Sequence, residues 1–270
     1  MTEPSQPQAV RRALILERVQ REGGASLADL ARDHAVSLVT VHRDLEVLSE
    51  SGLIERVRGG ARALPDRRSR IETAWDSRLR EAAGAKDAIA AHARTLIEDG
   101  TTIFIDASST GLALANELDM RPPEALTLVT TSPAIALGLT AESIDVIVAP
   151  GELDKHMRAL MGRWTVEFLE QVNLATAFIS AAGVTLEQGL TTFRRPLADT
   201  LNAARASAAQ TVAIVDASKF GRVSLLTVAR PEEIDLLITD DAIPNATAQA
   251  FRDAGLRLEV TRRHEEDVSE

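Results

Sequence analysis

The chain has 270 residues, of which 45% are hydrophobic, and a formal net charge of −10 at pH 7. This length can bury more than one core, so we expect two domains. Cysteine is absent, which excludes disulfides and thiolate metal sites, and the apolar runs are shorter than the ~20 residues of a membrane span. We therefore expect a cytoplasmic protein with no membrane contact and, because its five histidines are scattered, no metal or other cofactor.

The first predicted domain covers residues 8–64 and contains a helix-turn-helix pattern. Ser26 and Ser37 each precede a helical segment, where a side-chain oxygen can accept hydrogen bonds from the first N–H groups. Three apolar side chains of the second helix recur at spacings of four and three: Val41, Leu45 and Leu48. They predict packing against the first helix, with residues 40–44 facing outward into the major groove of DNA.

A wing is predicted directly after the second helix. An alternating segment, an Arg-Gly-Gly turn and a returning segment occupy residues 53–64, which is typical of a β-hairpin. An arginine-bearing wing at this distance favours a DNA-binding domain over the alternative, a helical subdomain for protein contacts. The predicted DNA-contacting residues are Ser26, Ser37, Val39, Thr40, His42, Arg43, Arg56, Arg58, Gly59 and Gly60.

The charge is unevenly distributed along the chain. Residues 1–70 hold 12 basic and 10 acidic side chains, and the rest of the chain holds 18 and 30. DNA affinity would therefore depend on a few placed arginines and on dimer symmetry rather than on a broad basic field.

Residues 65–83 are charged, with a helical pattern around Trp75, and predict a linker. Residues 84–261 alternate apolar runs with helical patterns, which predicts an α/β domain with a mainly parallel sheet covered by helices on both faces. The expected strands lie at 102–105, 126–129, 144–148, 176–179, 212–215 and 234–238. The expected helices lie at 86–98, 111–118, 133–140, 158–171, 196–209 and 245–254, and the tail 262–270 is predicted to be disordered.

Polar residues and glycines follow the expected strands, at the edge where parallel sheets bind ligands. Loops rich in hydroxyl groups, including Ser108 and Ser132, run directly into helices, and Lys219 follows the fifth strand. Each loop alone is equally well explained by capping and turn formation. Their coincidence at successive strand ends favours an anion site, because hydroxyls, helix N-termini and a cation are what a phosphate needs.

The first domain carries a recognisable motif set. Its elements are Val36-Ser37, Thr40, His42-Arg43, Asp44-Leu45 and Gly59-Gly60-Ala61. With these elements the segment resembles the DNA-binding domain of the DeoR family of bacterial transcriptional regulators. His42 stands where that family usually has arginine.

Residues 71–241 resemble the sensor domain of the same family, whose wider fold group includes ribose-5-phosphate isomerases. The match rests on the loop 106–111 and on the stretch Asp216-Ala217-Ser218-Lys219-Phe220-Gly221. It implies that the effector pocket is lined by Asp106, Ser109, Thr110, Thr131, Gly151, Gly183, Asp216 and Lys219.

The chain departs from the sensor pattern at four positions: Ser108 and Pro150 replace usual glycines, Ala198 a usual glutamate and Asn202 a usual lysine or arginine. The last two losses suggest a changed effector, with Arg194 or Arg195 as a substitute cation.

The resemblance implies a repressor of a carbohydrate-use operon that is not an enzyme. Its expected partners are double-stranded operator DNA, a small phosphorylated sugar or related metabolite, and further copies of itself in a homodimer or higher oligomer. One alternative is a sugar-phosphate isomerase fused to a DNA-binding domain, which Ala198 and the unpaired carboxylates disfavour. Another is a scaffold that has lost both binding activities.

Overall fold

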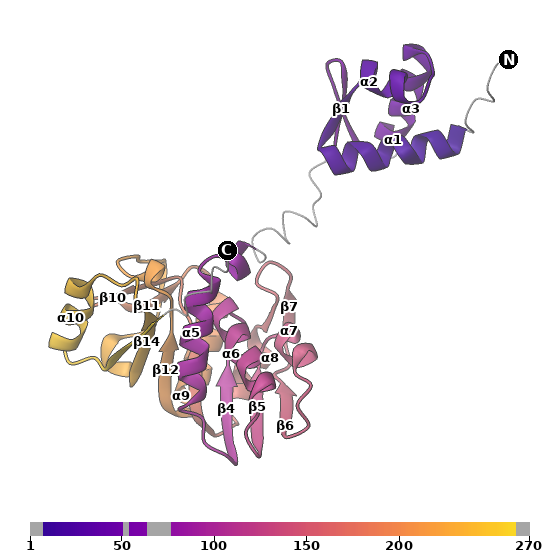
Figure 1. Ribbon diagram of the computed structural model, residues 1–270. Coiled ribbons are helices and arrows are strands. Elements are labelled where there is room, and N and C mark those ends of the chain that lie inside the picture. The colour runs from indigo at the N-terminus through magenta and orange to yellow at the C-terminus, as the bar shows by residue number, and fades with distance from the viewer. Residues whose placement is uncertain (1–7, 51–53, 64–76, 263–270) are drawn as a thin grey trace, which may run out of the picture. The chain divides into compact units, whose positions relative to one another are not determined.

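The computed structural model describes residues 8–50, 54–63 and 77–262 (Figure 1). The chain divides into two compact units, residues 1–73 and 74–270. The helical pattern around Trp75 and nearly all of the tail 262–270 lie outside the described residues. Of the predicted linker, residues 77–80 form a helical turn and Ala83 begins a helix.

The first unit is a winged helix-turn-helix, as the sequence predicts. Its helices are α1 (Gln8–Glu22), α2 (Leu27–Asp33) and α3 (Leu38–Glu50), and its strands are β1 (Gly24–Ser26), β2 (Ile54–Val57) and β3 (Gly60–Ala63). The strands form an antiparallel sheet in the order β1-β3-β2. The buried core is Ile15, Val19, Leu30, Val41, Leu45, Leu48, Ile54 and Ala61, so the predicted apolar stripe of α3 is confirmed.

Asp44 corrects the expectation that all of residues 40–44 face outward. Its side chain is fully buried, because it lies three residues after Val41 and so on the inner face of α3. Arg11 Nε donates to one carboxylate oxygen at 2.6 Å and Arg12 Nε to the other at 2.9 Å. Burial alone would raise the pKa of Asp44, but the two guanidinium groups outweigh it and lower the pKa.

The second unit contains a seven-stranded parallel sheet in the order β15-β14-β12-β9-β4-β5-β6. These strands are β4 (Thr101–Ile105), β5 (Leu126–Thr130), β6 (Ile144–Val148), β9 (Leu174–Ile179), β12 (Ala208–Ile214), β14 (Leu236–Asp240) and β15 (Leu258–Thr261). The helices are α5 (Ala83–Arg94), α6 (Ser109–Met120), α7 (Pro133–Gly138), α8 (Arg163–Leu169), α9 (Arg195–Ala206) and α10 (Asn245–Asp253), with short 3₁₀ turns η1 (Ala217–Lys219) and η2 (Pro231–Glu233).

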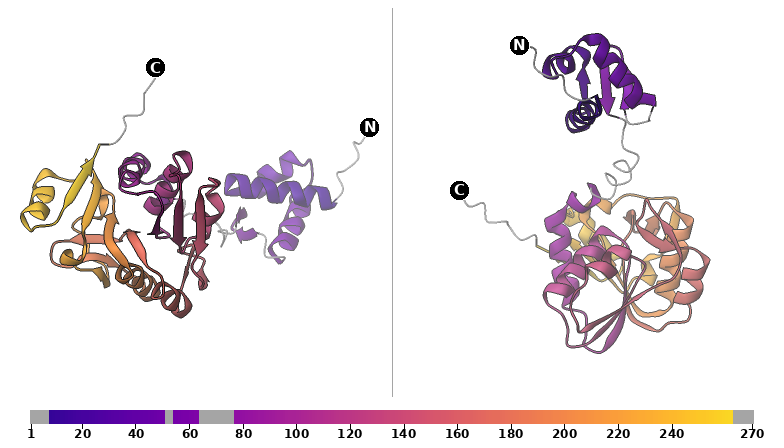
Figure 2. Two further views of the ribbon diagram at one scale, coloured as in Figure 1. Left: turned by 90° about the horizontal axis from the view of Figure 1, so that it is seen from below. Right: turned by 90° about the vertical axis from the view of Figure 1, so that its right-hand side faces the viewer.

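Helices cover both faces of this sheet, as predicted (Figure 2, right). Alternate residues of each strand enter opposite cores: Ile103 and Ile105 pack with α5, α6 and α7, whereas Phe104 packs with α8, α9 and α10. The strands are apolar on both sides because both sides are buried. None of the described helices is long and apolar enough to cross a membrane.

Short antiparallel strands are an addition that the sequence did not predict. The hairpin β7 (Glu152–Asp154) and β8 (Ala159–Met161) precedes α8, and β10 (Gly183–Thr185), β11 (Gly189–Thr192) and β13 (Leu226–Ala229) form a small sheet. The predicted helix 158–171 is therefore wrong in its first part. Arg158 and Gly162 both have positive φ, of 52° and 108°, which a continuous helix does not allow.

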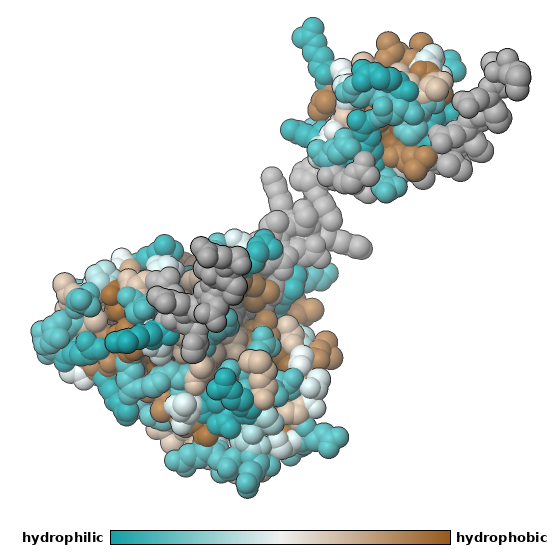
Figure 3. All heavy atoms as spheres, viewed as in Figure 1, coloured by the Kyte–Doolittle hydropathy of each residue, from teal (hydrophilic) through white to brown (hydrophobic). Residues whose placement is uncertain are grey.

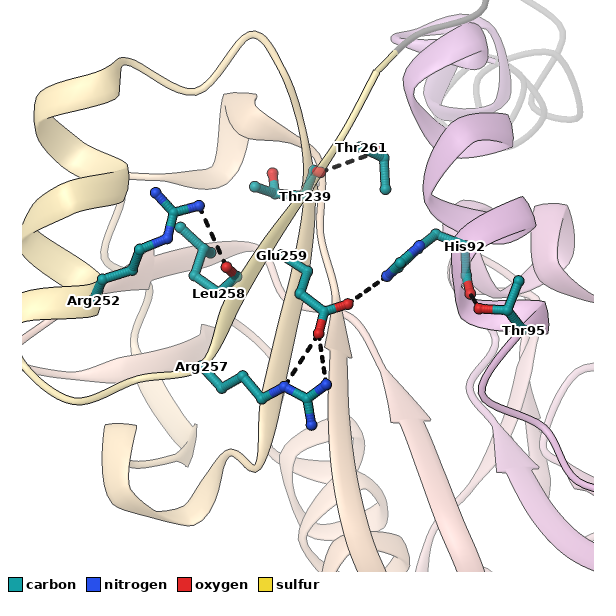
Figure 4. A network of polar contacts seen from close by, with 8 residues as sticks. All are labelled: His92, Thr95, Thr239, Arg252, Arg257, Leu258, Glu259 and Thr261. Atoms are coloured by element: carbon teal, nitrogen blue, oxygen red, sulfur yellow. Dashed lines mark hydrogen bonds and ion pairs between the residues drawn. The ribbon is translucent and has the colours of Figure 1, made fainter.

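The C-terminal strand is tied to α5 by side chains (Figure 4). Glu259 of β15 contacts His92 of α5 and also accepts two hydrogen bonds from Arg257, at 3.1 and 2.7 Å. The hydrogen bond to His92 is the main cause that lowers the pKa of Glu259. These contacts fix α5 against the edge of the sheet.

Asp44→Asn should lower the free energy of unfolding of the first unit by about 3 kcal/mol, because Arg11 is left buried beside a neutral group. Because the pKa of Asp44 is lowered in the folded protein, its carboxylate stabilises the fold at every pH above the ordinary pKa of 3.8. This contribution to the free energy of unfolding is lost as the pH falls through the pKa that Asp44 has in the folded protein. Urea unfolding at neutral pH and below pH 3.8 measures both effects. The exposed Glu17→Gln on α1 is the control, and an equally stable Asp44→Asn would contradict the analysis.

Candidate DNA-binding surface and ligand cavity

The two predicted helix caps are formed in the first unit. Ser26 Oγ accepts the N–H of Asp29 at 3.1 Å, and Ser37 Oγ accepts the N–H of Thr40 at 3.2 Å. Ser37 Oγ also lies 2.9 Å from Thr40 Oγ1. Both serines therefore fix where α2 and α3 begin, and remain exposed.

The exposed face of α3 carries Val39, His42 and Arg43, with Thr40 half-buried beside them. Val39 is 63% exposed. Arg43 makes no ion pair with the described residues. This face combines an apolar contact, a hydroxyl and a cation, the side-chain types that read base edges.

The wing is linked to α3 by a polar contact. Arg56 of β2 donates to His42 Nε2 at 2.6 Å and lies 3.7 Å from Glu46. The imidazole at the position where the DeoR family usually has arginine therefore holds the wing beside the recognition helix.

The tip of the wing depends on two glycines. Gly59 has a φ of +89°, which glycine adopts without strain. A Cβ on Gly60 would lie 2.2 Å from the carbonyl oxygen of Ala25, so only glycine allows β3 to approach β1 this closely. Arg58, between β2 and these glycines, is exposed.

The second unit contains a cavity of about 350 Å³ beside the carboxyl ends of β4, β9 and β12. Six of the predicted effector-binding residues line it: Asp106, Ser108, Ser109, Thr110, Asp216 and Lys219. A second set of polar side chains that line the cavity was not predicted from the sequence: Arg78, Glu81, Lys86, Ser180, Thr192, Ser218 and Arg222.

The N-terminus of α6 opens into this cavity. Ser108 Oγ accepts the N–H of Gly111 at 2.8 Å, and the carbonyl of Ser108 accepts the N–H of Leu112 at 2.9 Å. The N–H groups of Ser109 and Thr110 have no acceptor within the described residues. Two unpaired amides at the positive end of a helix are suited to an anion.

Asp106 connects the ends of two neighbouring strands. One carboxylate oxygen accepts the N–H of Ser108 at 3.1 Å, and the other accepts the N–H of Ser180, after β9, at 2.8 Å. Burial raises the pKa of Asp106, although the side chain of Ser108 and these two backbone hydrogen bonds oppose the rise. The carboxylate therefore shapes the loop that presents the α6 amides.

Cations from two segments meet at the cavity. Lys219 Nζ lies 3.8 Å from the Asp216 carboxylate. Lys86 is only 5% exposed, and burial lowers its pKa. Arg78 and Arg222 also line the cavity. Together with the α6 amides, these groups provide positive potential for a phosphate or carboxylate.

Four predicted effector-binding residues lie outside the lining. Thr131 and Ser132 are buried, and the carbonyl of Thr131 accepts the N–H of Leu160 of β8 at 2.8 Å. A Cβ on Gly151 would lie 2.1 Å from Thr165 Oγ1, and one on Gly183 would lie 2.2 Å from the carbonyl oxygen of Arg222. The hairpin β7-β8 covers the end of β5, and both glycines permit close backbone packing.

The wall formed by β8 and α9 is apolar. Met157, Ala159, Leu197 and Leu201 line it, and Ala198 is buried in the core. Arg194 pairs with Asp154 at 2.7 Å and Arg195 with Asp199 at 2.8 Å, and neither lines the cavity. Within the described part of the chain, no cluster of His, Asp and Glu could hold a metal ion.

Gly111→Ala should disrupt the α6 amides. Its Cβ would lie 2.5 Å from the carbonyl oxygen of Asp106 and 2.8 Å from its carboxylate, so the loop must move. We expect a loss of about 1–3 kcal/mol in stability, measured by urea unfolding. Gly138→Ala, whose Cβ meets nothing within 4 Å, is the matched control, and equal stability of the two variants would contradict the analysis.

Comparison with known families gives two matches. Residues 11–67 match the DeoR-like helix-turn-helix domain, and residues 81–241 match the DeoR C terminal sensor domain. The two matches fall on the two units of the structure.

Several regulators are similar over almost their whole length. The transcriptional regulator GolR of Listeria innocua is 34% identical over 93% of this chain and 97% of its own. The glycerol-3-phosphate regulon repressor of Escherichia coli is 31% identical over 91% and 96%, and the repressor GlcR of Bacillus subtilis is 34% identical over 92% of each. Ribose 5-phosphate isomerase A from Neisseria gonorrhoeae aligns over 52% of this chain and 54% of its own, with 19% identity and a TM-score of 0.38, which is too distant to bear on function.

Proposed function

Because this chain belongs to the DeoR family of transcriptional regulators, we propose that it is a repressor of a carbohydrate-use operon whose operator binding is controlled by a small phosphorylated sugar or related metabolite. The observation that carries the effector class is the cavity that is lined both by the N-terminus of α6, with its unpaired amides, and by Lys219 and Lys86. The name of the E. coli relative, which refers to a glycerol-3-phosphate regulon, supports a phosphorylated small molecule.

The DNA-binding half of the proposal rests on α3 and the wing. Arg43 reads base edges and Arg58 contacts a phosphate, while the bond from Arg56 to His42 keeps the two elements in register. Two half-sites one helical turn apart require two such units, so the functional species is a homodimer or a higher oligomer of even number.

The effector acts by preferring one conformation. A ligand that binds the DNA-bound and the released states equally shifts nothing, so the cavity must differ between the two states. The change is transmitted to the separation or angle of the paired DNA-binding units.

Isomerase chemistry receives little support from the cavity. A general base needs an accessible carboxylate, but both oxygens of Asp106 accept backbone N–H groups. One oxygen of Asp216 accepts the N–H of Ser218 at 3.0 Å. The α9 position where the family usually has glutamate is the buried Ala198.

Arg43→Ala should weaken binding to DNA from the protein's own promoter by about 10- to 100-fold per half-site, since a good base contact contributes about 1–3 kcal/mol. Arg58→Ala should instead weaken binding to all sequences and reduce the salt slope by about 1. Fluorescence polarisation over a salt series measures both. Arg163→Ala, at an exposed arginine of α8, is the control, and specific binding retained by Arg43→Ala would count against the proposal.

Lys219→Ala should leave operator affinity unchanged and weaken effector binding by about 10- to 100-fold, because a charge-assisted hydrogen bond contributes about 1.5–3 kcal/mol. Thermal shift with sn-glycerol 3-phosphate and other sugar phosphates measures the binding. Lys155→Ala, at an exposed lysine outside the cavity, should behave as the parent. A normal ligand response in Lys219→Ala would overturn the assignment of this site.

A further inference from the structure

Lys86 is a buried cation that holds backbone carbonyls. Its side chain projects from the first turn of α5 and is 5% exposed. The ammonium donates to the carbonyl oxygens of Arg78 and Glu81. These are its hydrogen-bond partners within the described residues, and an ammonium has three N–H groups. One donor therefore remains for the cavity that Lys86 lines.

The two carbonyls belong to residues 77–82, which we call the entry segment. Residues 77–80 form a helical turn and the N–H of Glu81 bonds to the carbonyl of Ser77 at 2.8 Å. The turn ends at Ala82, whose φ of 53° is left-handed and unfavourable for a residue with a Cβ. A cation at the end of such a turn satisfies carbonyls that have no helical partner.

The entry segment is connected to both functional parts of the chain. It directly follows residues 64–76, through which the chain arrives from the winged helix-turn-helix unit. Arg78, Glu81 and Ala82 also line the cavity. A ligand in the cavity would therefore lie beside the segment that leads to the DNA-binding unit.

The charges around Lys86 depend on what occupies the cavity. Lys219 and Arg78 repel its ammonium, while Asp216 and Glu81 attract it. A phosphate adds about −1.5 to −2 charges. It would offset the repulsion among the cations and favour the arrangement in which the ammonium stays between the two carbonyls.

We propose that Lys86 is an effector-binding residue that couples the ligand to the DNA-binding unit, because the bound anion strengthens its hold on the entry segment. This inference rests on the proposed function, since it requires an anionic effector in this cavity. Lys219 and the α6 amides supply binding, whereas Lys86 supplies binding and transmission. The entry segment is the element that changes from loosely held to fixed.

Hydrogen exchange with mass-spectrometric detection on the full chain tests the coupling, with sn-glycerol 3-phosphate and inorganic phosphate as probes. In the parent protein, either probe should slow exchange both at residues 109–112 and at residues 77–86, by about 5-fold or more, the lower end of usual allosteric coupling. In Lys86→Met, with the probe at a concentration that saturates the weakened site, protection at 109–112 should persist and protection at 77–86 should disappear. Protection retained at 77–86 in this variant would overturn the coupling. Lys155→Met, at an exposed lysine, should keep both effects.

The outcomes distinguish a failure of the proposed function from a failure of the coupling through Lys86. The proposed effector class fails, and the coupling fails with it, if no compound changes exchange anywhere in the parent protein. The compounds are the two probes and a broader panel of sugar phosphates. If residues 109–112 are protected but 77–86 are unchanged in the parent protein, the coupling alone is overturned, whatever the variants do. Should Lys86→Met be poorly folded by thermal unfolding, Lys86→Gln, which keeps a donor without the charge, takes its place. A gel shift then asks whether the variant still binds promoter DNA while the probe no longer changes that binding.

Discussion

The cavity of the second unit depends on one buried carboxylate. Asp106 joins the ends of β4 and β9 by accepting N–H groups from Ser108 and Ser180, and so sets the direction in which α6 begins. The same cavity is lined by Ser109 and Thr110 and by the cations of residues 78–86 and 219–222. A parallel sheet brings strand ends together, but a specific polar contact is needed to fix the loops that leave them.

Two of the buried aspartates, Asp44 and Asp106, illustrate how neighbouring groups decide the effect of burial on a pKa. Asp44 lies between two guanidinium groups, and its pKa is lowered despite the loss of water. Asp106 is held by neutral donors, namely backbone N–H groups and the side chain of Ser108, and burial raises its pKa. The first arrangement is a buried ion cluster that joins α1 to the inner face of α3. The second holds the loop before α6 in place beside the cavity. On the face seen in Figure 3, both units expose mainly hydrophilic side chains with hydrophobic ones between them.

Sequence patterns predicted the elements that bury continuous apolar faces. The stripe of Val41, Leu45 and Leu48 and the alternating apolar strands were recognisable because their periods match helix and sheet. The short strands β7, β8 and β10 have three residues each, too few to show a period, so the covering of Thr131, Ser132 and Gly151 was missed. Individual residues were missed where their partners lie elsewhere in the fold. Lys86 was missed as a residue of the cavity because it stands at the start of a helix, where a lysine is usually exposed, and its contacts with Arg78 and Glu81 do not show in the sequence. Asp44 was misplaced because a charged residue is expected in water unless its partners on α1 are known. The distinctive positions of the wing, Gly59 and Gly60, were predicted because positive φ and close approach leave a glycine signature in the sequence.

The difference in rigidity between Asp44 and the entry segment bears on where regulation can act. An effector can shift a conformational equilibrium only by its difference in affinity for the two states, typically about 1–3 kcal/mol. Breaking the ion cluster of Asp44 with Arg11 and Arg12 would require more than this, so the core of the DNA-binding unit is unsuited to switching. The entry segment is different: it is one helical turn, it ends in a left-handed alanine that costs about 1 kcal/mol, and a single ammonium holds its carbonyls. The cost of the left-handed alanine and the stabilisation from the ammonium oppose each other, and both are similar in size to the free energy that a bound anion can supply. This segment can therefore respond to the ligand while the folded units on either side of it stay intact.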